Sequence, residues 1–125
     1  MEKLTESTSR SNIPCSDEAE IAVLSCAFLT PNETLPACIE NITPGHFYRH
    51  AHRAIYETFI EMYGSGKVID LVTVTQQLTD EEMLGRIGGA EYLHEMLTSE
   101  ATSAGLTHYL DILRQKYVLR QLIET

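Results

Sequence analysis

The 125-residue chain carries 18 acidic and 9 basic residues, which gives a formal net charge of −9. Such a chain, without a dense basic cluster, is a poor independent binder of DNA or RNA. It has no apolar run of the length that a membrane span needs, and its polar first residues hold no secretory signal core. Three cysteines without a C-x-x-C pair are typical of a reducing compartment. We therefore expect one cytoplasmic domain.

The first part of the chain is predicted to form a tail and two helices. Residues 1–13 are expected to be a disordered tail, and residues 14–125 the folded domain. Ser16 is a suitable N-cap for a helix that reaches Leu29–Thr30. Three acidic residues in the first turn of this helix also suit the helix dipole. A short second helix is predicted over Thr34–Asn41, with Pro36 tolerated in its first turn.

Residues 46–70 form the stretch around which the rest of the chain is expected to be organised. Apolar side chains recur there every three or four residues, which predicts an amphipathic helix ending at Gly64-Ser65-Gly66. Five of the nine aromatic residues fall in this stretch. Since aromatic side chains bury the most area, this helix is predicted to be the core helix. Its apolar face comprises Phe47, His52, Ile55, Tyr56, Phe59, Ile60 and Tyr63.

Three further short helices are predicted before the last one. Asp70 can cap a helix over residues 71–78, which we assign as helical despite its β-branched run because its leucines and Val74 keep helical spacing. A short helix is expected over residues 79–84, and another over residues 90–97 after the Gly88-Gly89 turn. The fold class is therefore all-α, a compact bundle of about six helices.

The last helix is predicted to run from Leu106 to the end of the chain, with apolar residues on more than one side. A helix of this kind has two partners, its own domain and another element or chain. No stop signal follows it, so we expect the chain to be a fragment truncated in this long helix. Tyrosine and arginine are favoured in interface cores. The candidate self-assembly residues are Tyr109, Leu113, Tyr117 and Arg120.

The sequence offers little that points to catalysis. The segment Gly64-Ser65-Gly66-Lys67 lacks the earlier glycine and the hydroxyl residue of a phosphate-binding loop. We predict no catalytic, nucleotide-binding or metal-binding residue and no cofactor in this chain. One alternative is a small metal-dependent enzyme built on His46, His50 and His52, although no H-E-x-x-H motif supports it. Two others are a stand-alone helical interaction domain and an independent DNA-binding domain.

Six motifs, in this order, resemble the N-terminal domain of the bacterial DnaB-type replicative helicases. Ser25 stands where that family has glycine, and Tyr56 stands where phenylalanine is common. The motifs are Pro14-x-x-x-Glu18-Ala19-Glu20-x-Ala22-Val23-Leu24, Ile42-Thr43-Pro44-x-x-Phe47-Tyr48, His52-x-x-Ile55-Tyr56, Ile69-Asp70-Leu71-Val72-Thr73-Val74, Ile87-Gly88-Gly89-x-x-Tyr92-Leu93 and, after Tyr109, Arg120-Gln121-Leu122-Ile123.

This resemblance implies a small helical bundle that belongs to a ring-shaped, hexameric, ATP-dependent DNA helicase. ATP, Mg and DNA would be bound by a C-terminal RecA-like domain that is absent from this chain. The N-terminal domain itself would be non-catalytic. It would form a collar by pairing with copies of itself through Leu106–Ile123 and the continuation of that helix. It would also contact primase at the replication fork, and a helicase loader is a further candidate partner.

Overall fold

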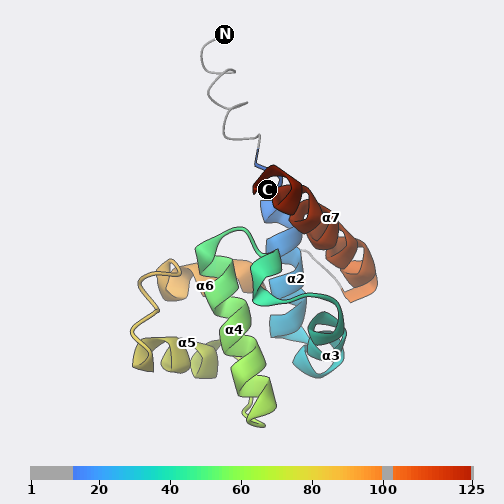
Figure 1. Ribbon diagram of the computed structural model, residues 1–125. Helices are drawn as coiled ribbons and strands as arrows, with labels where there is room; N and C mark the ends of the chain where they lie inside the picture. The colour runs from blue at the N-terminus through green and yellow to red at the C-terminus, as the bar shows by residue number, and fades with distance from the viewer. Residues whose placement is uncertain (1–12, 100–102, 125) are drawn as a thin grey trace.

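The computed structural model describes residues 13–99 and 103–124, and over these residues the chain is helical without any strand (Figure 1). The predicted all-α bundle of about six helices is therefore confirmed. The predicted tail lies almost wholly outside the described residues. None of the described helices combines the length and the apolar character needed to cross a membrane. The elements are α2 (Asp17–Leu29), α3 (Pro31–Asn41), η1 (Pro44–His46), α4 (His50–Gly64), α5 (Leu71–Asp80), α6 (Gly89–Leu97), η2 (Ser103–Gly105) and α7 (Leu106–Glu124).

Helix α2 has the most extensive contacts of the described helices, and α3, α4, α6 and α7 all pack on it (Figure 1). Small residues such as Ala19, Ala22 and Ala27 are buried on it and let its neighbours approach closely from several sides. The sequence predicted that the helix within residues 46–70 would hold this place. Helix α4 does supply much of the aromatic bulk of the core, since Tyr56 and Phe59 are fully buried. The helix on which the others pack, however, is α2, which the sequence did not single out.

The start of α4 differs from the prediction. Residues 44–46 form a separate 3₁₀ turn, and α4 begins only at His50. Between them Phe47 is extended and fully buried, with its ring centroid 5.0 Å from that of Tyr56. The end of α4 at Gly64 is as predicted, and Gly66 follows in the left-handed conformation with φ +72°.

Helix α5 begins where the sequence predicted. The Asp70 carboxylate accepts a hydrogen bond from the Thr73 N–H (2.8 Å), and the Thr73 hydroxyl accepts one from the Asp70 N–H (2.9 Å). This reciprocal cap satisfies two amide groups that the first helical turn leaves free. It confirms that the β-branched run is helical.

The short helix expected over residues 79–84 is absent. Helix α5 instead continues to Asp80, and the Met83 and Leu84 amides donate back to the Leu78 carbonyl (2.8 and 3.2 Å). Glu82 takes a left-handed conformation with φ +59°, which a helix cannot continue through. The acidic residues there close one helix rather than open the next.

The Ser25 hydroxyl lies on α2 in the middle of the core, fully buried and without a hydrogen-bond partner. An unpaired buried hydroxyl costs free energy. We expect Ser25→Ala to raise the free energy of unfolding by about 1 kcal/mol, measured by urea denaturation. The control Ser16→Ala removes the hydroxyl that accepts from the Ala19 amide at the start of α2 and should lower it by about 1 kcal/mol. A loss of stability in Ser25→Ala would show that the hydroxyl is satisfied.

Candidate interaction surface and the polar network that positions it

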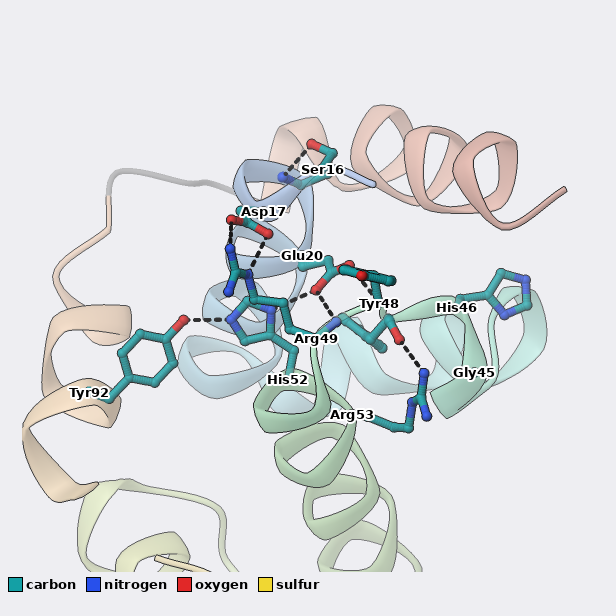
Figure 2. A network of polar contacts seen from close by, with 12 residues as sticks. Ser16, Asp17, Glu20, Gly45, His46, Tyr48, Arg49, His52, Arg53 and Tyr92 are labelled. Atoms are coloured by element: carbon teal, nitrogen blue, oxygen red, sulfur yellow. Dashed lines mark hydrogen bonds and ion pairs between the residues drawn. The ribbon is translucent and has the colours of Figure 1, made fainter. Parts of the chain in front are cut away.

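A buried carboxylate, that of Glu20 on α2, organises the start of α4 (Figure 2). It accepts hydrogen bonds from the backbone N–H groups of Tyr48 (2.7 Å) and Arg49 (3.4 Å) and from Nδ1 of His52 (2.6 Å). Arg49 is the N-cap of α4, and its own side chain does not cap the helix. Glu20 therefore supplies, from another helix, acceptors and negative charge at the positive end of α4.

The same network continues from α4 to α6. With the Nδ1 proton of His52 turned to Glu20, Nε2 accepts a hydrogen bond from the Tyr92 hydroxyl (2.5 Å), and Figure 2 shows the three side chains in a row. Burial raises the pKa of Tyr92, which keeps its hydroxyl a donor. Gly88, the N-cap of α6, has φ +109°, and a Cβ there would lie 3.0 Å from the Tyr92 side chain. Glycine is thus required to place Tyr92.

Next to the buried network lies an exposed ion pair between Asp17 and Arg49 (Figure 2). The guanidinium donates two hydrogen bonds, from Nε to Oδ1 (2.7 Å) and from Nη2 to Oδ2 (2.5 Å). These bonds lower the pKa of the Asp17 carboxyl. The pair adds a second link between α2 and the residues that precede α4.

Arg120 on α7 binds the residue stretch before α2 and the 3₁₀ turn η1. It is only 6% exposed, and it donates to the carbonyls of Pro14 (2.8 Å), Gly45 (3.4 Å) and His46 (3.1 Å). The Tyr117 ring, one turn earlier on α7, stacks on the His46 ring at 4.2 Å. Helix α7 is therefore held against η1 and the segment before α2.

The four residues predicted for self-assembly lie on the inner side of α7. Leu113 (1% exposed) and Arg120 are buried in the chain's own domain, and Tyr109 and Tyr117 are half-buried against it. The structure thus brings the four together on one face, where they contact the domain's own residues. Their contact with a second copy stays a prediction.

The opposite side of α7 carries a different set of apolar side chains, exposed over its last two turns: Val118, Leu119, Leu122 and Ile123, at 55, 44, 69 and 62%. We call them the outer face of α7. With Asp111, Arg114 and Gln115, the first two line an open hollow of about 580 Å³. The expected two-sided helix is therefore observed. Periodicity alone marked both apolar sides and could not tell which side the domain covers.

The three histidines of the metal hypothesis do not share a site. Nδ1 of His46 accepts from the Thr43 amide (2.9 Å), and burial lowers the pKa of this imidazole, which keeps it neutral. Both nitrogens of His52 are engaged by Glu20 and Tyr92, and His50 is exposed on another turn of the chain. Within the described residues no group of three or more His, Cys, Asp or Glu side chains could hold a metal ion.

Fold and surface together define an all-α domain whose last helix leaves one apolar side uncovered. The family model described as the DnaB-like helicase N-terminal domain matches residues 12–115. The chain belongs to this family, so the resemblance in its sequence motifs is confirmed.

Known proteins agree with this assignment. Over 112 residues, which are 90% of this chain and 24% of either relative, the chain is 43% identical to the replicative DNA helicase DnaB of Geobacillus stearothermophilus and 38% to the replicative DNA helicase DnaC of Bacillus subtilis (strain 168). It thus spans about a quarter of the length of these curated relatives.

Solved structures show the same fold. The N-terminal domain of DnaB helicase from Mycobacterium tuberculosis superimposes with a TM-score of 0.85 at 37% identity, over 90% of this chain and 80% of that one. A DnaB-like replicative helicase, in a structure that describes its interactions with primase, gives a TM-score of 0.70 at 26% identity, over 87% of this chain and 25% of that one.

Replacing the buried carboxylate tests how far the domain depends on it. We expect Glu20→Gln to lower the free energy of unfolding by about 3 kcal/mol, because its amide group would face donors and leave them unpaired. Glu18→Gln, an exposed change two residues away in the same first turn, is the matched control and should cost less than about 1 kcal/mol. Equal urea midpoints for the two variants would contradict this role of Glu20.

The Asp17–Arg49 pair predicts a pH dependence. Because the folded-state pKa of Asp17 is lowered, its contribution to stability is present at neutral pH and is lost as the pH falls through that pKa. Asp17→Asn should therefore remove part of the loss of stability below about pH 4, measured by urea midpoints from pH 7 to pH 2. Asp111→Asn, at a long 3.9 Å contact with Arg114, is the control and should change the profile less. An unaltered profile in Asp17→Asn would refute the assignment.

Proposed function

We propose that this chain is the N-terminal assembly and partner-binding domain of a hexameric, ATP-dependent replicative DNA helicase. In the proposal, copies of the domain pair through α7 to form the collar of the ring, and the domain contacts primase during DNA replication. The observation that carries it is the outer face of α7, four apolar side chains exposed on a helix whose opposite side is packed on the domain.

The energetics of this face favour contact with another polypeptide. Complete burial of an exposed aliphatic side chain contributes about 1.5–3 kcal/mol. The four residues of the outer face therefore offer several kcal/mol to a partner that covers them. The proposal keeps Tyr109, Leu113, Tyr117 and Arg120 as residues on which pairing depends, through the position that they give α7.

The domain itself is proposed to be non-catalytic. Its buried cluster of titratable groups, Glu20 with His52 and Tyr92, is closed, because the acceptors and donors of the two buried side chains are already engaged within the fold. A substrate would have to break these bonds to enter. ATP, Mg and DNA would bind elsewhere in a longer parent protein, which we expect to act in the cytoplasm and to meet a helicase loader as a further candidate partner.

Primase contact is supported by a relative, the 26% identical DnaB-like replicative helicase whose solved structure describes its interactions with primase. Binding of the chain to the primase of its own organism, measured by titration calorimetry, tests this part of the proposal. Saturable binding is expected, and no heat of binding at high micromolar concentration would contradict it.

Self-association through α7 is tested by the double variant Val118→Asp/Leu122→Asp. We expect light scattering to show dimers or larger assemblies of the unaltered chain as concentration rises, and a lower average mass for the variant, because buried aspartates would lose their hydration without a partner. The control is Val72→Asp on α5, where a valine is 76% exposed at a distance from α7. It should associate like the unaltered chain. An unaltered chain that stays monomeric, or a double variant that associates equally well, would overturn pairing through the outer face.

A further inference from the structure

A groove unrelated to α7 runs along the exposed side of α4, where α4 faces residues 81–87. It consists of two hollows of about 330 and 420 Å³. Both are lined by Ala54, Glu57 and Met83, so they form one continuous depression. We call it the α4 groove. Its floor is made of small or half-buried side chains, Ala51, Ala54 and Met83.

The two ends of the α4 groove carry opposite charges. His50, Arg53 and Arg86 line the hollow at the start of α4. Glu61 and Glu81 line the other hollow, and Glu57 lies between the two. On α4, Arg53 at the basic end and Glu61 at the acidic end are eight residues apart, which corresponds to roughly 12 Å along the helix axis.

These charges are left unpaired within the fold. Among the described residues, none of the arginines and glutamates of the groove forms an ion pair, whereas the nearby Arg49 is bound to Asp17. One terminal nitrogen of Arg53 donates to the Phe47 carbonyl (3.0 Å), and its Nε–H is buried without an acceptor. The buried Nε–H cannot reach a partner, but the other terminal nitrogen of Arg53 and the exposed guanidinium of Arg86 keep donors for an incoming carboxylate.

The acidic end is also preorganised. The side-chain amide of Gln77 donates to Glu61 (3.0 Å) and to Glu81 (2.9 Å), so one neutral group holds two carboxylates beside each other. Among the described residues no basic side chain forms an ion pair with Glu61 or Glu81, and Lys67 donates instead to the amide oxygen of Gln77 (3.2 Å). A cationic group that arrives from outside would be attracted to both.

We propose that the α4 groove binds the α4 groove of a second copy of this chain, in an antiparallel, two-fold arrangement. Rotation by 180° about an axis near Ala54 and Met83 sets the basic end of each copy against the acidic end of the other, as a two-fold contact between identical patches requires. The chain carries a net charge of −9, so two copies repel each other over most of their surfaces. In the groove, by contrast, Arg53 and Arg86 of one copy face Glu61 and Glu81 of the other.

The anatomy of the surface suits this contact. An apolar floor of alanines and a methionine, which permits close approach, is framed by charged residues, as in many protein–protein interfaces. The contact is separate from the outer face of α7 and goes beyond the proposed function. A chain with both surfaces could hold two neighbours at once, which any closed assembly of more than two copies needs.

A charge-swap experiment tests the α4 groove without any contribution from α7. All variants carry Val118→Asp/Leu122→Asp, so that the outer face of α7 cannot pair. The first adds His50→Glu and Arg86→Glu, which makes both ends of the groove acidic. The second adds Glu57→Lys and Glu61→Lys, which makes both ends basic. All four changed residues of the groove are exposed, so the fold should tolerate them.

We expect the background chain to dimerise in sedimentation equilibrium at low salt, and less so as salt rises. Each charge variant alone should raise the dimer dissociation constant by more than about tenfold, because like charges then face each other. An equimolar mixture of the two variants should dimerise again, since the changed residues that face each other are then opposite in charge. Glu33→Lys/Glu40→Lys on α3 makes the same charge change on exposed residues elsewhere and should leave dimerisation intact.

Three results would overturn the proposal: a background chain that is monomeric at the highest concentration, charge variants that dimerise as well as the background, or a mixture that stays monomeric. None of these bears on pairing through α7, because the background already lacks that contact. Conversely, if Val118→Asp/Leu122→Asp had the same assembled mass as the unaltered chain, pairing through α7 would be refuted. The mixing experiment would still test the α4 groove.

Discussion

The burial of one carboxylate, that of Glu20, is the constraint on which the rest of the domain depends. A charge with no exposure to water is tolerated only where donors surround it, and the donors around Glu20 come from the residues that open α4 and from His52 within it. To satisfy this side chain, the chain must turn sharply after η1 and start α4 at a set place on α2. His52 then reaches Tyr92, so the requirement extends to α6. Three helices are positioned by one chain of hydrogen bonds.

The motifs that define the family in sequence therefore meet in space. Glu20, Tyr48, His52 and Tyr92 come from four separate motifs and form one connected network (Figure 2). Arg120, from a fifth motif, donates hydrogen bonds to the carbonyls of Pro14 and His46. Specific partners of this kind, rather than apolar bulk, explain why short motifs far apart in the chain identify the fold.

Local signals were enough to predict much of the helical bundle. Ser16 and Asp70 were recognisable as caps because their hydrogen bonds involve residues only three positions away. The Gly64–Gly66 stop was equally local. The helix expected over residues 79–84 was wrong, because the backbone of Leu78 captures the following amides and Glu82 turns left-handed, which no local composition signalled. The network around Glu20 also escaped prediction, since an acidic residue in a first helical turn normally faces solvent.

The hydrogen bonds of Arg120 on α7 do not depend on pH, unlike the ion pair between Asp17 and Arg49. The three acceptors of Arg120 are backbone carbonyls, which cannot take up a proton in the range where side chains titrate, and a guanidinium does not lose one. The hydrogen bonds of Arg120 are thus independent of the protonation state of any carboxylate or imidazole, whereas the Asp17–Arg49 link weakens in acid. Whatever covers the outer face of α7 therefore meets a helix whose bonds through Arg120 are the same in acidic and neutral surroundings.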